Sequence, residues 1–383
     1  MKNTSSRGAK AITLAGAASL MVGGIAISAS TVGATVKTAH TSAYLACVVT
    51  DTGGINDKSF NASAYAGLVA AQNKLGKSKL NIKYLSSQQE SDYAPNIKTF
   101  VNEKCGIIVT VGFLMGNATW TAAHSYPNQH FAIVDQTNGD PNCYSGKCAT
   151  AANIDGLTYS TDQDGFLAGY EAAAVSKSHI IATYGGMQFG SVTIYEDGFV
   201  AGARYYNAHL PKGGHKVKVL GWNPNTQKGD FVGSFTDQAG AATLTTGYLT
   251  SGADLVFPVA GSDGLGTNSA VKTWNSSHVN KALVDWVDTD GCVSDAGDCN
   301  LFLGSVTKGV TASVRDAVLA AQAGKFKGGN YVGNLKNAGV ALVENTKYNK
   351  ISASLAGTIK SLMAQIESGK ISVDPTKYAA STN

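Results

Sequence analysis

The chain has 383 residues, of which 44% are hydrophobic and 15% are charged, and it contains 44 glycines. This composition is typical of a globular protein with many turns, and the length favours two domains over one. The arginines are Arg7, Arg204 and Arg315. Arg is the preferred bidentate partner of phosphate and carboxylate, so this scarcity argues against a nucleotide or a nucleic acid as the ligand.

The N-terminus has the order of a secretory signal peptide. Three basic residues precede an Ala-, Gly- and Ile-rich run over 11–29, and small residues at 32–34 offer a cleavage site. We expect removal of residues 1–34, followed by a flexible leader over 35–42. Cleavage would leave 27 basic and 26 acidic residues, a formal charge of +1. A chain with so little net charge is not expected to bind a polyanion. The alternative is an uncleaved anchor, because the run is about long enough to span a bilayer.

A strand, a polar loop and a helix open the predicted mature chain. The apolar run over 44–50 predicts a buried parallel strand. Apolar residues then recur every three or four positions over 64–75, which predicts a helix with Asn56 or Asp57 as its N-cap. The loop over 51–61 therefore lies at the carboxyl end of the first strand. Ligands bind at that edge in open α/β sheets.

In the rest of the chain, strand-like apolar runs alternate with helix-like periodic segments. This alternation predicts an α/β fold with two lobes, each a doubly wound parallel sheet. The first series has expected strands over 80–85, 106–111 and 130–134, with helices over 92–102 and 117–125. The second series has expected strands over 179–184, 217–220, 253–259 and 282–287, with helices over 163–175 and 195–209 and one ending at Leu249. A helix ending at Ala323, a strand over 338–343 and a helix over 355–366 complete the prediction.

Two lobes with several crossings between them would enclose a cleft and form a hinge. We expect a first lobe from residues 43–153 with about 289–337. The second lobe is expected from residues 154–288 with about 338–383.

The loop over 51–61 also carries a family resemblance. Read as D-x-G-G-x-x-D-K-S-F-N, it resembles the opening signature of the basic membrane protein family, purine-nucleoside-binding lipoproteins that serve as solute receptors for ABC importers. Weaker similarities follow to about residue 345. Residues 260–266 are similar to the family's A-G-x-x-G-x-G, residues 287–290 to V-D-x-D, and residues 304–308 to T-S-V-x-K. The resemblance implies a two-lobed periplasmic-binding-protein fold of type I.

The resemblance implies how a nucleoside base would be held. Phe60 would stack on the base from the first lobe, while Asp51, Asn61 and Asp135 would face its edge. Gly261 would add a backbone contact from the second lobe. Its neighbourhood reads G-x-x-G-x-G rather than G-x-G-x-x-G and comes late in the strand order, so a dinucleotide site is not expected.

The other implied contacts come from the second half of the chain. Asp288 and Lys308 would bind the ribose hydroxyls. A second stacking ring must come from the second lobe, and our choice is Phe231, with Phe199 and Phe235 as alternatives. One stacked aromatic pair contributes about 0.5–1.5 kcal/mol beyond area burial.

An even number of cysteines suits an exported protein with disulfides. The zinc-site alternative is weak, because no His falls at ligand spacing near them. The family's usual membrane tether is a lipidated Cys just after the apolar run. The first Cys here is Cys47, inside the predicted strand, a departure that leaves membrane attachment open. The possible disulfides are Cys143–Cys148, Cys292–Cys299 and Cys47–Cys105.

We therefore expect an exported, monomeric, non-enzymatic receptor at the outer face of the cytoplasmic membrane or in the periplasm. Its expected partners are a purine nucleoside and the permease and ATPase of an importer, with no cofactor, no metal and no nucleic acid. One alternative keeps the fold and binds a sugar or another small neutral polar solute. Another is a nucleosidase-type hydrolase using clustered acids such as Asp288 and Asp290. The chain has no G-x-S-x-G and no H-E-x-x-H motif.

Overall fold

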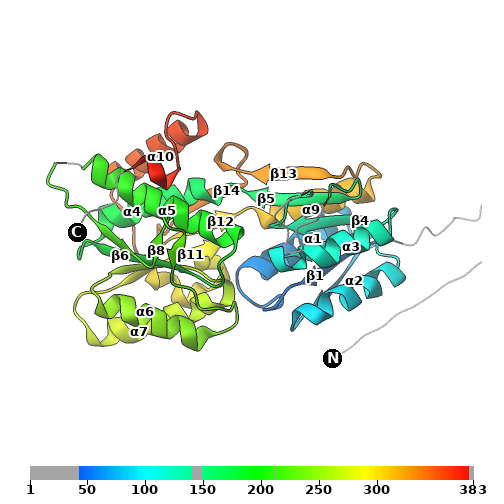
Figure 1. The fold of residues 1–383 in the computed structure, drawn as a ribbon, viewed down its shortest axis with the longest axis horizontal. Coiled ribbons are helices and arrows are strands. Elements are labelled where there is room, and N and C mark those ends of the chain that lie inside the picture. Colours follow the sequence, from blue (N-terminus) through cyan, green and yellow to red (C-terminus); the bar gives the residue numbers. More distant parts are fainter. Residues whose placement is uncertain (1–42, 140–148, 211, 379–383) are drawn as a thin grey trace, which may run out of the picture. The chain divides into compact units, whose positions relative to one another are not determined.

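The computed structural model describes residues 43–139, 149–210 and 212–378. The predicted signal peptide, the leader over 35–42 and the Cys143–Cys148 pair lie outside these residues. Within them, no helix is long and apolar enough to cross a membrane. In this part of the chain two six-stranded, mainly parallel sheets carry the fold, which confirms the predicted α/β class (Figure 1). One antiparallel strand in the second sheet departs from the prediction of purely parallel sheets.

The first sheet is entirely parallel, with strand order β13-β5-β4-β3-β1-β2. Residues of β1 alternate between its two faces, so Ala46 and Val48 join one buried cluster while Cys47 and Val49 join another. Both faces are thus covered, which is why the strand reads as a continuous apolar run. The strands are β1 (Tyr44–Thr50), β2 (Leu80–Ser86), β3 (Ile107–Val111), β4 (His130–Val134), β5 (Ile154–Tyr159) and β13 (Gly329–Gly333).

Helices from two distant parts of the chain cover the first sheet. The helix α1 (Phe60–Leu75) packs with α9 (Val310–Gln322), and α2 (Tyr93–Asn102) packs with α3 (Gly116–Ser125). The predicted disulfide between Cys47 and Cys105 is present. We call this sheet with its four helices the first lobe.

The second sheet has strand order β14-β12-β11-β10-β6-β7, and β14 is its antiparallel member. The strands are β6 (Ile180–Gly185), β7 (Lys218–Leu220), β10 (Leu255–Val259), β11 (Leu283–Asp288), β12 (Phe302–Lys308) and β14 (Val340–Glu344). A two-stranded sheet, β8 (Trp222–Asn223) with β9 (Lys228–Gly229), lies beside β6.

The helices α4 (Thr161–Val175) and α5 (Gly190–Ala208) pack together on the second sheet, with α10 (Ala353–Glu367) against α4. The pair α6 (Gln238–Thr250) and α7 (Gly264–Ser277) lies on the other side of the second sheet (Figure 1). Residues of this pair belong to another buried cluster. The short helix α8 (Gly291–Ser294) follows β11. We call this sheet with its helices the second lobe.

Three expectations need correction. The strand β5 lies in the first sheet, between β4 and β13, although we expected residues 154–159 in the second lobe. The strand β12 lies in the second sheet, although we expected residues 302–308 in the first lobe. A buried apolar run predicts a strand but does not specify which sheet it joins. The helix expected from Tyr195 begins earlier, at Gly190, where the Phe189 carbonyl accepts hydrogen bonds from the first turn.

The chain therefore passes between the sheets after β5, after β12 and after β13. The three passages lie side by side, because the amide of Ser160 donates to the Gly333 carbonyl (2.7 Å) and the amide of Gly309 donates to the Gly339 carbonyl (2.8 Å). A Cβ atom on Gly339 would stand 2.2 Å from the Gly333 Cα, so only glycine fits this contact. These hydrogen bonds join the passages into one connection between the lobes.

Candidate functional site

A pocket lies where strands of both sheets end. Its walls follow β1, β3 and β4 in the first lobe and β6, β10, β11 and β12 in the second. The empty space between the lining side chains is about 630 Å³, a figure that includes space open to solvent. Seven predicted site residues line it: Asp51, Phe60, Asn61, Asp135, Gly261, Asp288 and Lys308.

The loop over 51–61 is folded onto the first turn of α1 by one carboxylate. Asp57 accepts hydrogen bonds from the backbone amides of Ser59 (3.0 Å), Asn61 (2.7 Å) and Ala62 (3.0 Å). These amides are among those that a helix start leaves unpaired, so the Asp57 side chain satisfies them, although Ser59 rather than Asn56 or Asp57 occupies the N-cap position. These hydrogen bonds fix Phe60 and Asn61 at the pocket wall.

Asp51 and Asn61 form one polar group in the pocket lining, which we call the amide end. The Asn61 side-chain amide donates to Asp51 Oδ1 at 2.9 Å, and both side chains are buried. The Asn61 Oδ1 atom is buried without a hydrogen-bond partner in the described part of the chain. Burial raises the pKa of the Asp51 carboxyl to about 8, against the opposing effect of the bond from Asn61. This end thus holds polar groups with unused hydrogen-bonding capacity.

Lys308, Asp135 and Asp288 form a second group, which we call the ammonium end. The Lys308 Nζ atom lies 2.8 Å from Asp135 Oδ2 and 3.6 Å from Asp288 Oδ1. Asp288 also accepts hydrogen bonds from the hydroxyls of Ser59 (2.8 Å) and Tyr195 (3.0 Å). Burial alone would lower the pKa of Lys308, but the two carboxylates outweigh it and the pKa is raised, so Lys308 is a cation at neutral pH.

The backbone at both carboxylates is in the left-handed region. The φ angle is 64° at Asp135 and 66° at Asp288, each at or just after the last residue of a strand. Left-handed conformations of non-glycine residues cost on the order of 1 kcal/mol each, and they concentrate at functional sites. Two such residues meet at one ammonium group, which makes this place a candidate binding site.

Aromatic rings line the pocket, but Phe231 is not among them. The Phe231 ring packs edge-on against Trp222, with 5.9 Å between ring centroids. The lining rings include Phe113, Phe189 and Phe235. The Phe189 ring centroid lies 5.3 Å from that of Phe113 and 6.5 Å from that of Phe235.

Three lining rings were therefore missed or ranked too low. Phe113 follows β3, Phe189 lies between β6 and α5, and Phe235 was only an alternative to Phe231. The position of Phe113 and Phe189 after parallel strands was the available signal. The other alternative, Phe199, is fully buried in the core.

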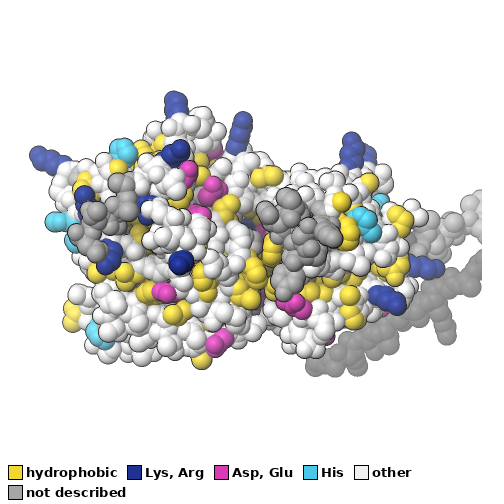
Figure 2. All heavy atoms as spheres, in the orientation of Figure 1, with side chains coloured by type: hydrophobic (Ala, Val, Ile, Leu, Met, Phe, Trp, Pro, Cys, Tyr) yellow, Lys and Arg dark blue, Asp and Glu magenta, His cyan; other side chains and the backbone are white. Residues whose placement is uncertain are grey.

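The charge of the pocket limits its ligands. Four carboxyl groups line it, those of Asp51, Asp57, Asp135 and Asp288, and the raised pKa keeps Asp51 largely protonated at neutral pH. Among the described residues, Lys308 is the one cation in the lining. The two arginines within the described ranges lie elsewhere, and no group of three or more His, Cys, Asp or Glu there could hold a metal ion. On the visible face in Figure 2, Lys and Arg side chains are scattered rather than gathered into a patch.

Comparison with known proteins agrees with this architecture. Residues 45–372 match the family model of the PnrA-like ABC transporter substrate-binding proteins. An ABC transporter nucleoside-binding protein from Lactococcus lactis subsp. cremoris is 33% identical over 87% of this chain and 89% of its own length. Basic membrane protein A from Borreliella burgdorferi is 27% identical over 85% of this chain and 86% of its own length.

A crystal structure shares the fold. It is that of an ABC transporter solute-binding protein from Aeropyrum pernix, with a TM-score of 0.71 and 21% identity, over 86% of this chain and 92% of that one. The family match covers both sheets and the pocket between their strand ends. The chain therefore belongs to the family of PnrA-like ABC transporter substrate-binding proteins.

Proposed function

We propose that the protein is the extracytoplasmic receptor of an ABC importer and binds a purine nucleoside in this pocket. The observation that supports it most is the presence of two unlike polar ends and several aromatic rings in one pocket. A nucleoside has the matching parts: a flat base with hydrogen-bonding edges, and a sugar with hydroxyl groups. The name of the Lactococcus lactis relative supports the same ligand class.

In this proposal the ribose lies at the ammonium end. Its hydroxyls can donate to the Asp135 and Asp288 carboxylates and accept from the Lys308 ammonium. Hydrogen bonds to charged groups contribute about 1.5–3 kcal/mol, roughly twice the neutral value. The hydroxyls of Ser59 and Tyr195 already fix the orientation of the Asp288 carboxylate. Ligand binding therefore costs little conformational entropy at this side chain.

The base lies at the amide end. The free Asn61 Oδ1 atom would accept from an N–H of the base, and Asp51 would contact the same edge. Phe60 would stack on the base, and Phe189 or Phe235 takes the role first given to Phe231. A base that satisfies Asn61 also removes the cost of an unpaired buried oxygen, about 1–3 kcal/mol.

The same pocket disfavours a nucleotide. A phosphate would meet the carboxylates of Asp135 and Asp288, and the Lys308 ammonium that could offset its charge is already paired with Asp135. Like charges at close range in a partly buried site repel strongly. An uncharged nucleoside fits the charge of the site better.

Closure of the two lobes would enclose the ligand. We propose that the first lobe comprises residues 43–159 with 310–333 and the second comprises residues 161–308 with 340–378. The connecting segments over 334–339, with Ser160 and Gly309, would form the hinge. Hinge closure around a ligand is a common transition of such two-lobed proteins.

As partners we propose the permease and ATPase of an importer, with the receptor exported and acting outside the cytoplasm as a monomer. We propose a transport role without catalysis. This proposal rests on family membership, because the family consists of substrate-binding proteins of ABC transporters.

Isothermal titration of the mature protein, unfolded and refolded to strip carried-over ligand, tests the proposal. The panel is adenosine, guanosine, inosine, uridine, ribose, glucose and galactose. Submicromolar binding of a purine nucleoside without binding of free sugars is expected. Binding of a sugar alone would refute the nucleoside assignment, and release of free base from a nucleoside would refute a purely receptive role.

A further inference from the structure

A second set of contacts joins the lobes outside the ligand pocket, at Lys58. Its Nζ atom lies 2.6 Å from Asp295 Oδ1, with the lysine side chain 45% exposed and the aspartate side chain 8% exposed. Lys58 belongs to the loop before α1 in the first lobe, and Asp295 directly follows α8 in the second. Neither residue lines the pocket.

The second lobe holds Lys58 at two points. Besides the ion pair, the Thr289 hydroxyl donates to the Lys58 backbone carbonyl at 3.1 Å. Lys58 has a φ of 55°, a left-handed conformation that lysine rarely adopts. The hydroxyl of the next residue, Ser59, donates to Asp288 at the end of β11. Two consecutive loop residues, Lys58 and Ser59, therefore contact the second lobe.

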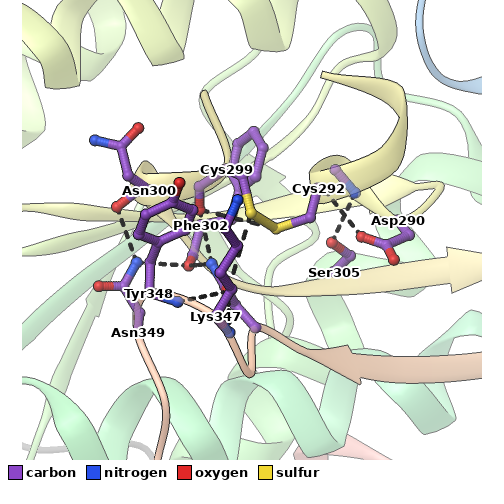
Figure 3. The surroundings of a disulfide bond; sticks show 11 residues. Asp290, Cys292, Cys299, Asn300, Phe302, Ser305, Lys347, Tyr348 and Asn349 are labelled. Carbon is purple, nitrogen blue, oxygen red and sulfur yellow. Dashed lines mark hydrogen bonds between the residues drawn. A yellow bond between two sulfur atoms is a disulfide. The ribbon is translucent and has the colours of Figure 1, made fainter. Parts of the chain in front are cut away.

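Contacts within the second lobe also hold Asp295. The Asn268 side-chain amide donates to Asp295 Oδ2 at 3.1 Å, from within the second lobe. The predicted disulfide between Cys292 and Cys299 is present and ties together the segment that carries Asp295 (Figure 3). The Gly291 amide donates to Ser305 Oγ at 3.0 Å, which anchors the segment to β12.

We propose that Lys58 and Asp295 are positioning residues that hold the lobes closed over the ligand. The proposal rests on the proposed function in that closure is taken to retain the nucleoside. A carboxylate held by an asparagine and a disulfide-tied segment is a fixed acceptor, and the half-exposed lysine docks onto it when the lobes meet. Loss of the pair therefore raises the dissociation rate more than it lowers the association rate.

The chain offers a matched control. Lys272 pairs with Asp298 at 2.8 Å, and this lysine is 54% exposed. Asp298 belongs to the same disulfide-tied segment, but both partners lie in the second lobe. Lys272→Met thus removes a similar ion pair from the same segment without touching an interlobe contact.

Stopped-flow measurement of inosine binding tests the proposal. Lys58→Met and Asp295→Asn should each raise the dissociation rate constant about tenfold, with the association rate constant changed less than about threefold. Lys272→Met should leave both constants as in the wild type. The exchanged pair Lys58→Asp with Asp295→Lys should recover part of the lost affinity. A Lys58→Met variant indistinguishable from Lys272→Met would overturn the proposal.

A readout without ligand separates this proposal from the function. Should the wild type bind no purine nucleoside, the proposed function fails, and amide hydrogen exchange of residues 288–295 decides the role of the pair. Faster exchange in Lys58→Met than in Lys272→Met would support the closure contact. Equal exchange in the two variants would overturn it.

Discussion

The two ends of the pocket differ in how far their polar groups are already satisfied. At the ammonium end, Lys308 is paired with two carboxylates, and Asp288 accepts from two hydroxyls besides. At the amide end, Asn61 Oδ1 is buried without a partner in the described part of the chain. The first end is preorganised, while the second is completed only when a ligand supplies a donor. The first should therefore set the overall affinity and the second the choice among ligands.

The largest effect is expected from Lys308→Met. This change leaves Asp135 and Asp288 buried without their cation, and breaking a buried pair costs about 3–5 kcal/mol. The dissociation constants of all purine nucleosides should rise about 100-fold or more, and the free energy of unfolding should fall. Titration calorimetry and urea unfolding measure the two effects, with Lys272→Met as the control. An affinity within threefold of the wild type would contradict the role of the ammonium end.

Asn61→Ala should act on the choice of ligand. Removing the amide takes away the free acceptor and the donor to Asp51. We expect the ratio of inosine to adenosine affinity to change about tenfold, equivalent to about 1.4 kcal/mol. Lys308→Met should leave the same ratio within about twofold. If Asn61→Ala weakened the binding of inosine and adenosine equally, the amide end would not determine the choice of ligand.

The rings provide a third comparison. Phe189 lines the pocket, whereas Phe231 packs on Trp222 outside it. Phe189→Leu should weaken nucleoside binding about fivefold, within the energy of one stacked pair. Phe231→Leu should leave affinity within about twofold. Titration calorimetry measures both affinities. A loss of affinity in Phe231→Leu but not in Phe189→Leu would show that Phe231 is the second stacking ring.

The positions of the polar residues in this pocket were largely predictable, partly from strand ends and partly from the family resemblance. Asp51, Asp135 and Asp288 each lie at the end of an apolar strand, a position that the sequence defines and the structure reproduces. The placement of β5 and β12 was not predictable, because the sheet that a buried strand joins depends on partners distant in the chain. The Phe231 side chain lies in an irregular segment, and local periodicity does not specify which way such a side chain points.

The smallest predicted effect concerns pH. The Asp51 pKa is about 8 in the folded protein, against 3.8 ordinarily, so the folded state binds this proton more tightly. This tighter proton binding stabilises the folded state fully below about pH 4, and the stabilisation is lost as the pH rises through 8. Asp51→Asn does not titrate, so its free energy of unfolding relative to wild type should increase between pH 5 and 8. We expect a change on the order of 1 kcal/mol, because the open pocket admits water.

Urea unfolding of the ligand-free protein at several pH values measures this difference. Glu171→Gln is a useful comparison, because burial raises the pKa of Glu171 to about 9 within α4, away from the pocket. Its relative stability should rise with pH in the same direction, without a change in nucleoside affinity. A pH-independent difference for Asp51→Asn would show that its carboxyl is ionised in the folded state.

The central claim is that one pocket binds both parts of a nucleoside. Titration of the refolded protein with inosine, and separately with hypoxanthine and ribose, tests it most directly. We predict submicromolar binding of inosine and binding at least about 1,000-fold weaker for each half, because the halves engage only one end each. Binding of ribose alone with the affinity of inosine would contradict the account.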